Sequence, residues 1–414
     1  MMPLKPLHAY FVATGSWFLA FGLQSVLFAY LVTLVLNESA ERVGFAQMAY
    51  LIPGTLLILL GGSVADQFGG RRIAIIGQLL AALMAAGLAL TMWLTELTYP
   101  LFILFAISMG CAQAILTPAR DGLLPVVAGG MIQRRVMQAS LIQFGMQMVG
   151  LLLASLTDSI GVLYMLAGQS VILLAGVMAY AKLDIVAPTT TPQFEVSFVK
   201  QLRFMVLEGF SSVVASRAMR MVVLQNVAMG LFFMGSYIVT LPLLIRDIYD
   251  GTAVSLSWVN AANSLGLFLA ISVLLKLGDV QKQGRALLIS QWFGSLVLVV
   301  AGFEFGFEIL VLNLFAWGIC GGVAMTMSRT IMQEHAPADQ RARMMAFYAL
   351  SFMGAGPLGA LLSGYLVTWF GPLIALRLSA GAMLIVSLIV FLEGNLWRLG
   401  NVPTATKAEN DQTL

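Results

Sequence analysis

Uncharged polar side chains are the groups in this chain best placed to bind a ligand, because they interrupt long apolar runs. An amide inside such a run needs a hydrogen-bond partner, which is either another helix or a bound molecule. The side chains that we expect to line one central cavity are Gln24, Gln113, Gln143, Gln147, Asn226, Tyr237, Asn260 and Asn263. Met and Phe residues neighbour several of them, so the cavity should be neutral, soft and partly aromatic. Such a cavity suits a bulky amphipathic ligand better than a small ion.

Ionisable side chains, in contrast, avoid the middle of the apolar runs. Asp158 lies at the end of one run, where it is either an interfacial anchor or a candidate for coupling to an ion. His8 and His335 do not belong to an HxxxD or HExxH cluster. Cys111 and Cys320 are too few for a disulfide framework or a CxxC metal site. We therefore expect no catalytic group, no metal site and no cofactor.

The composition indicates that the elements carrying these residues face lipid. Hydrophobic residues make up 60% of the 414-residue chain and charged residues only 10%, whereas soluble domains carry about 25% charged residues. A soluble fold of this size needs a polar surface that this chain cannot supply. The net charge of +3 is small and no basic stripe alternates with aromatic residues, so nucleic acid is not an expected partner. Membrane lipid is.

A helix needs about 20 apolar residues to cross a bilayer, and twelve segments satisfy this. We expect spans near 10–36, 43–65, 72–95, 99–118, 136–156, 160–181, 221–245, 253–277, 285–303, 308–327, 344–369 and 372–393. The predicted fold is an all-α membrane protein of twelve transmembrane helices in two pseudo-symmetric six-helix bundles. The bundles are 1–181 and 218–398, separated by a cytoplasmic linker, 182–217, whose segment 194–217 reads as an interfacial helix. Residues 399–414 form a tail.

The distribution of Lys and Arg tests the helix count, because these residues accumulate in cytoplasmic loops. With the N-terminus inside, all but three of the 22 Lys and Arg residues fall on the cytoplasmic side. The exceptions are Arg42, Arg246 and Arg377. We therefore expect both termini to be cytoplasmic.

The two halves also repeat in sequence. An offset of 209 pairs Cys111 with Cys320, Thr117 with Thr326, Arg120 with Arg329, Gly145 with Gly354 and Gly150 with Gly359. Earlier in each half an offset of 213 pairs Gly22 with Gly235, Phe45 with Trp258 and Asp66 with Asp279. Duplicated halves are typical of proteins in which two bundles rock about a central site.

The loop between the second and third spans carries a recognisable motif, GGSVADQFGGRR at 61–72. Gly69 and Gly70 permit a tight turn. The motif resembles the G-x-x-x-D-x-x-G-R-[KR] signature of the major facilitator superfamily, and a degenerate copy, LGDVQKQGR at 277–285, occupies the matching loop of the second half. The resemblance implies that the loop carboxylates, Asp66 and Asp279, brace the cytoplasmic ends of the two halves. The conformational gate that we expect comprises Asp66, Gly70, Arg71, Arg120, Asp279, Arg285 and Arg329.

A second stretch, LTPARDGLLPVV at 116–127, is similar to the junction of the fourth and fifth helices in the bacterial enterobactin and macrolide exporters. There we expect Pro118 to end the fourth helix. The charged residue that proton-driven drug antiporters carry in that helix is missing, because 101–117 contains no charge. The resemblance covers the first half better than the second.

The resemblance implies a monomeric secondary transporter in a bacterial inner membrane that exports a small amphipathic molecule, such as a siderophore, a drug or a related metabolite, by alternating access. An importer of the same fold and a non-transporting membrane receptor or scaffold are the alternatives. A lipid-modifying membrane enzyme would need a catalytic cluster that the sequence lacks. Flux assays separate a transporter from a receptor.

Overall fold

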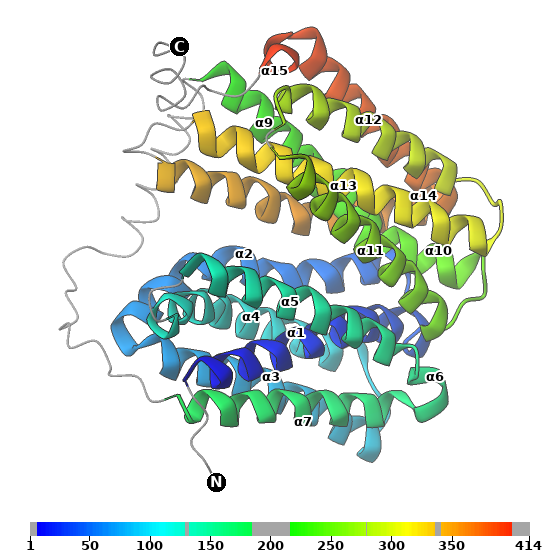
Figure 1. Cartoon of the computed structure of the whole chain (residues 1–414). Helices are drawn as coiled ribbons and strands as arrows, with labels where there is room; N and C mark the ends of the chain where they lie inside the picture. Colours follow the sequence, from blue (N-terminus) through cyan, green and yellow to red (C-terminus); the bar gives the residue numbers. More distant parts are fainter. Residues whose placement is uncertain (1–5, 129–131, 184–215, 279, 336–340, 400–414) are drawn as a thin grey trace, which may run out of the picture. The chain divides into compact units, whose positions relative to one another are not determined.

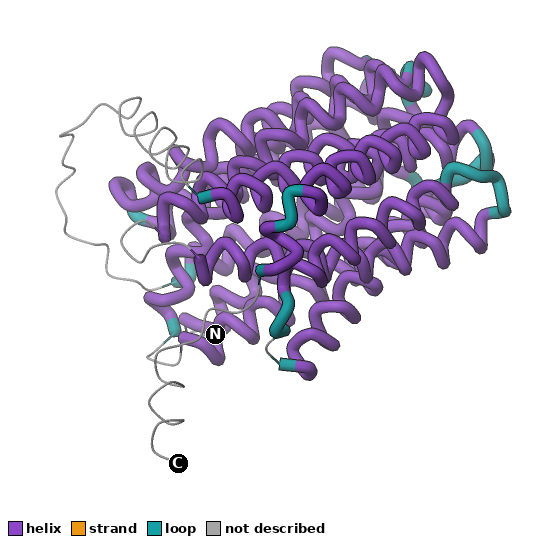
Figure 2. Tube along the Cα trace, turned by 90° about the horizontal axis from the view of Figure 1, so that it is seen from above, coloured by secondary structure: helices purple, strands orange, loops and turns teal. Residues whose placement is uncertain are grey.

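The computed structural model describes residues 6–128, 132–183, 216–278, 280–335 and 341–399, and these residues form helices joined by short turns. No strand occurs in this part of the chain (Figure 2). The helices group into two compact units. The first contains the helices of the first half together with Met234–Ala261 and Gly356–Ala375, and the second contains the other described residues of the second half.

Six long helices make up the first half of the chain (Figure 1). They are α1 (Pro6–Tyr30) with its π-helical extension η1 (Leu31–Val35), α2 (Ala40–Phe68), α3 (Gly70–Leu94), α4 (Tyr99–Val127), α5 (Ile132–Ala154) and α7 (Val162–Ala181), with the single turn α6 (Thr157–Ile160) before α7. Within this half α1 packs against α5 and α7, α2 against α4, and α3 against α4 and α7.

The second half repeats this plan. Its elements are α9 (Arg217–Ala228), η2 (Met229–Met234), η3 (Ser236–Thr240) and α10 (Leu241–Asp247), which form one span, then α11 (Ala253–Leu277), α12 (Gln283–Ala301), α13 (Phe307–His335), α14 (Arg341–Leu392) and α15 (Asn395–Arg398). The first helix of each half thus contains π-helical turns, in which the backbone hydrogen bonds span five residues instead of four. In the second unit α12 packs against α13 and α15.

The prediction of twelve membrane helices is confirmed. Among the described residues, ten stretches are apolar and long enough to cross a membrane. One of them lies in α14, whose 52 residues would extend about 78 Å if straight, more than twice the hydrocarbon thickness of about 30 Å. Gly371, with φ 77° and ψ 163°, breaks α14 into two spans. The 29-residue helix α2 supplies the remaining span.

Two expectations about local structure have different outcomes. Gly69 adopts φ 87° between α2 and α3, as the expected tight turn requires. The expectation that Pro118 ends the fourth helix is wrong, because α4 continues to Val127 with Pro118 and Pro125 inside it. Membrane helices tolerate proline where neighbouring helices and local adjustments satisfy the freed carbonyl. The predicted interfacial helix of the linker falls almost entirely on 184–215 and the predicted tail on 400–414, outside the described residues.

The sequence repeat corresponds to repeated geometry. Asn37 and Asp250, which are 213 residues apart, are the positive-φ residues other than glycine among those described, with φ values of 46° and 44°. They occupy the turn after the first helix of each half. Side chains of Asn and Asp tolerate this conformation better than other residues. The repeat therefore preserves the turn that reverses the chain direction after its first helix.

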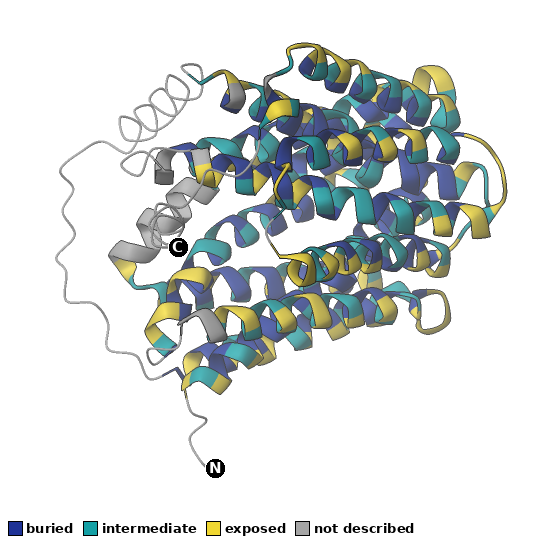
Figure 3. Cartoon of the chain, turned by 45° about the horizontal axis from the view of Figure 1, so that its top comes forward, coloured by how far each residue is buried: buried dark blue, intermediate teal, exposed yellow. Residues whose placement is uncertain are grey.

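Large apolar side chains cover the outside of the helices. Trp93 is 72% exposed, Leu275 79% and Leu392 73%, and exposed positions recur along the outer helix faces (Figure 3). A water-soluble protein rarely exposes so many large apolar side chains. The chain is therefore a multi-pass membrane protein.

Candidate functional site

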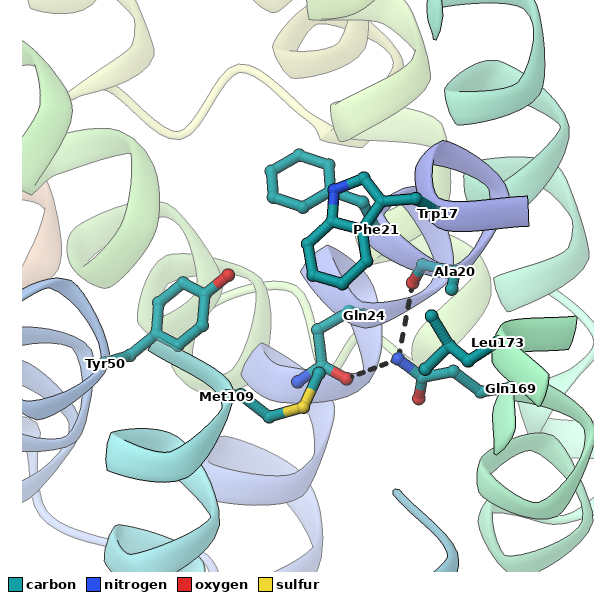
Figure 4. A pocket seen from close by; sticks show the side chains of 8 residues that line it. All are labelled: Trp17, Ala20, Phe21, Gln24, Tyr50, Met109, Gln169 and Leu173. Carbon is teal, nitrogen blue, oxygen red and sulfur yellow. Dashed lines mark hydrogen bonds between the residues drawn. The ribbon is translucent and has the colours of Figure 1, made fainter. Parts of the chain in front are cut away.

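A small pocket in the first unit collects aromatic, apolar and amide side chains from four helices (Figure 4). Its lining residues are Trp17, Ala20, Phe21, Gln24, Tyr50, Met109, Gln169 and Leu173. The α1 residues among them follow the spacing of a single helix face. The space between these side chains, counted together with the open solvent that adjoins it, is about 250 Å³. None of its eight lining side chains is charged.

Two buried glutamines form the polar corner of the pocket. Gln169 Nε2 donates hydrogen bonds to Gln24 Oε1 at 2.7 Å and to the backbone oxygen of Ala20 at 3.3 Å. Gln24 is 3% exposed and Gln169 is fully buried. The other two amide atoms, Gln24 Nε2 and Gln169 Oε1, are buried without a protein partner. An unpaired buried polar atom is costly and therefore calls for an explanation.

Tyr50 closes the pocket on the side of α2. Its hydroxyl donates a 2.6 Å hydrogen bond to Gln113 Oε1 on α4, and its ring lies 5.4 Å from the ring of Phe28. Both contacts fix the position of the phenol. Gln113 therefore lies behind the pocket wall and holds Tyr50 in place.

The remaining candidate binding residues lie elsewhere. Gln143 and Gln147 are half-buried on α5. In the first unit, the hydroxyl of Tyr237 donates a 2.7 Å bond to Asn260 Oδ1, and Asn260 Nδ2 donates to the backbone oxygen of Leu256. The structure thus joins Tyr237 to Asn260 and Gln24 to Gln169, as two separate polar pairs of the same unit.

Asn226 and Asn263 belong to the second unit, where each links two helices. Asn226 Nδ2 donates to the backbone oxygen of Tyr348 at 2.9 Å and to Ser351 Oγ at 2.8 Å. Asn263 Nδ2 donates to the backbone oxygen of Leu314 at 3.3 Å. These bonds link neighbouring helices, which is the alternative role that the sequence allows for each amide.

Several of the predicted gate residues join helices within one half. Arg71 at the start of α3 donates to the backbone oxygens of Tyr180 and Ala181 at the end of α7, at 3.1 Å for Tyr180. Arg285 at the start of α12 donates to the backbone oxygen of Trp397 at 3.3 Å, and its guanidinium lies 5.2 Å from the ring centre of that residue. The two arginines therefore make equivalent contacts in the two halves.

The other predicted gate residues differ from one another in their surroundings. Gly70 begins α3, and a Cβ on it would lie 3.3 Å from the backbone oxygen of Ala119. Arg120 is buried, pairs with Asp121 at 2.9 Å and lies 4.6 Å from the ring centre of Phe18. Arg329 is exposed. The side chain of Asp66, and Asp279 as a whole, lie outside the described residues, so their role as braces stays a prediction.

Asp158, the candidate for ion coupling, contacts the start of a helix from the other half within the first unit. Its carboxylate accepts hydrogen bonds from the backbone N–H groups of Ala253 at 3.4 Å and Val254 at 3.2 Å, at the start of α11. A carboxylate at a helix N-terminus interacts favourably with the helix dipole.

Further polar contacts join the halves nearby. Arg246 Nη1 donates to the backbone oxygens of Glu38 at 2.8 Å and Thr33 at 3.4 Å, and Gln47 Nε2 donates to the backbone oxygen of Ile238 at 3.1 Å. These contacts and those of Asp158 lie toward the end of the helices where η1 turns into α2, which we call the Asn37 end.

Sequence reasoning missed most of the pocket. Gln169 interrupts an apolar run in the same way as Gln113 and could have been found by the same signal. Trp17, Phe21, Tyr50 and Met109 could not, because aromatic and Met residues in membrane helices usually face lipid or core. Only the packing of α1 against α7 brings Gln24 and Gln169 together.

The model of the transmembrane secretion effector family, a group of major facilitator type, matches residues 8–409 of the chain. The chain belongs to this family. No curated protein matches the sequence. The family match and the helix arrangement together identify a membrane transporter of the major facilitator type.

Solved structures of low sequence identity share the fold. The nucleoside transporter NupG aligns with a TM-score of 0.74 at 14% identity, covering 95% of this chain and 100% of that protein. A peptide transporter POT in complex with sulfate gives 0.73 at 16% identity, covering 96% of both chains. A POT family transporter in complex with a thioalcohol-conjugated peptide gives 0.75 at 13%, covering 95% and 96%. At these identities the likeness concerns the fold alone.

Proposed function

We propose that this secretion effector family member exports a small, neutral or amphipathic molecule across a bacterial inner membrane by alternating access. The observation that carries the proposal is the uncharged pocket of aromatic rings, Met109 and paired amides in the first unit. Such a lining favours an apolar body with a few neutral polar groups over an ion, because an ion there would lose its hydration without gaining a counter-charge. The expected cargo classes are siderophores, macrolide-like drugs and related metabolites, and their uncharged members have this character.

The contacts between the halves at the Asn37 end support alternating access. Besides the polar bonds of Asp158, Arg246 and Gln47, the helices α2 and α14 approach closely there, since a Cβ on Gly44 would lie 2.7 Å from the backbone oxygen of Ala360. With the orientation expected from the distribution of Lys and Arg, this end faces outward. Breaking these contacts would release cargo to the outside, which is the direction of export.

Proteoliposomes that hold the full chain in a known orientation test the proposal. A tritiated macrolide should accumulate in inside-out vesicles and not in right-side-out vesicles, and an uncoupler should show whether a proton gradient is needed. Accumulation only in right-side-out vesicles would establish the importer instead. Saturable binding without flux in either orientation would establish a receptor.

A further inference from the structure

The pocket of the first unit contains a hydrogen-bond donor without a partner in the protein. Gln24 is 3% exposed, and its amide nitrogen makes no hydrogen bond. Figure 4 shows this nitrogen pointing away from Gln169, on the side of Tyr50 and Met109. A buried donor gains most from an acceptor placed at that position.

The hydrogen-bond network itself fixes which amide atom of Gln24 faces the pocket. The atom of Gln169 that contacts the backbone oxygen of Ala20 must be the nitrogen, because a carbonyl oxygen can only accept. The same nitrogen contacts one amide atom of Gln24 at 2.7 Å, which must therefore be the oxygen. The NH₂ group of Gln24 is left for the pocket. Gln169 is thus a positioning residue that gives the site its polarity.

We propose that Gln24 selects cargo that carries an uncharged oxygen acceptor, such as the carbonyl of a ketone, ester, lactone or amide, on a flat or ring-shaped apolar group. The rings of Trp17, Phe21 and Tyr50 line the remainder of the pocket and suit such a group. A carboxylate is disfavoured because no lining side chain is cationic. The inference rests on the proposed function in taking the ligand of this pocket as the cargo.

The lining of the pocket determines a suitable probe. Aromatic side chains stack well on a flat ring system, and the pocket is partly open to solvent, so a probe with fused rings suits its lining. The compounds 1-tetralone and tetralin have the same two rings and differ in one carbonyl group. They therefore isolate the contribution of the acceptor.

Equilibrium dialysis of both tritiated compounds against the full chain in nanodiscs measures the preference, with protein-free nanodiscs as the blank. We expect the wild-type protein to bind 1-tetralone about 5- to 30-fold more tightly than tetralin, as one well-placed hydrogen bond would give. Gln24→Met conserves the side-chain volume and should reduce the preference to about one, with tetralin affinity unchanged. Unchanged tetralin affinity also shows that the variant is folded.

Gln169→Met provides a readout that a purely structural role would not move. Without Gln169 the amide of Gln24 is free to turn, so its oxygen can face the pocket. Binding of 1,2,3,4-tetrahydroquinoline, whose ring N–H is a donor, should then strengthen while the preference for 1-tetralone falls. Loss of affinity for all three probes by the same factor would show that Gln169 does not set the polarity.

Equal binding of 1-tetralone and tetralin to the wild-type protein, or no saturable binding of either, would overturn the inference without any variant. So would a preference that survives in Gln24→Met. A preference for the carbonyl compound in a protein that shows no flux in vesicles would leave the inference standing and overturn the proposed function. Flux in vesicles without a preference for the carbonyl compound would leave the proposed function standing and overturn the inference.

Discussion

Amide side chains in these helices have two kinds of surroundings. The amide nitrogen of Asn226 donates to two acceptors on α14 and has no hydrogen left for a ligand. The amide nitrogen of Gln24, in contrast, has no hydrogen-bond partner among the described residues. The first arrangement is typical of a link between helices, and the second of a binding group. An amide in an apolar run is therefore informative about function only when its hydrogen bonds are known.

Asp158 is the second residue whose surroundings bear on its role. Because its carboxylate bonds to N–H groups at the start of α11, we expect Asp158→Asn to weaken closure of the Asn37 end. A charge–dipole contact of this kind contributes about 0.3–1 kcal/mol, so opening should increase about two- to five-fold. The measurement is the rate at which an impermeant maleimide labels Ser236→Cys, a buried position of η3, in a chain without Cys111 and Cys320.

Glu96→Gln is the matched control for Asp158→Asn, since Glu96 is an exposed acid in the turn between α3 and α4. It should leave the labelling rate unchanged. If Asp158→Asn also leaves the rate unchanged but abolishes the dependence of transport on a proton gradient, then Asp158 couples transport to protons and does not stabilise closure.

Pairs of glycines allow a close helix crossing, and this crossing repeats in the two halves. In the first half a Cβ on Gly22 of α1 would overlap the backbone oxygen of Gln147 of α5, and Gly150 lies against Gly22. In the second half a Cβ on Gly235 would overlap the backbone oxygen of Gly359. Small residues allow membrane helices to approach this closely. The repeat at offsets 213 and 209 thus conserves a crossing between two helices.

Gly22→Ala should destabilise the protein because the new methyl group forces α1 and α5 apart. Overpacking of this kind costs about 1–3 kcal/mol. Thermal unfolding in detergent, followed by size-exclusion chromatography after heating, should give a lower midpoint for this variant. Gly145→Ala on the same α5 meets open space, so its midpoint should stay level or rise, since alanine favours helix over glycine by up to about 1 kcal/mol. Equal midpoints for the two variants would contradict the crossing.

For the whole molecule, the three arginines that the charge distribution places outside all make specific contacts. Arg42 pairs with Glu38 at 2.9 Å, Arg246 donates to the backbone oxygen of Glu38, and the guanidinium of Arg377 lies 5.0 Å from the ring centre of Phe303. Each is therefore held in place by its neighbours. These contacts explain the exceptions without a change in the number of helices.

The expected orientation leads to a topology prediction. In a chain without its native cysteines, an impermeant maleimide added outside intact cells should label Asp250→Cys and should not label Thr190→Cys. Asp250 is exposed in the turn between α10 and α11, which the orientation places outside, and position 190 belongs to the predicted cytoplasmic linker. If the reagent labels position 190 from outside and does not label position 250, the orientation is the reverse of the expected one, and the proposed direction of transport is wrong.

The sequence by itself determined the fold class, the twelve spans and the repeat of the halves. These properties depend on the length of the apolar segments, on the charge of the loops and on the spacing of residues, all of which can be read from the sequence. It failed at Pro118, where the residues before and after a proline do not reveal whether neighbouring helices can satisfy the freed carbonyl. Helix ends in membranes are decided partly by such neighbours.

Only the tertiary structure decided which polar residues meet. Gln24 and Gln169 are 145 residues apart, and nothing local distinguishes their amides from those of Asn226 or Asn263, which link helices. Whether an amide is satisfied depends on the partner that packing supplies, and this is a property of helix crossings such as those at Gly22 and Gly150. The sequence therefore predicted that uncharged amides interrupt the helices, whereas the packing of the helices decides which of these amides lie together.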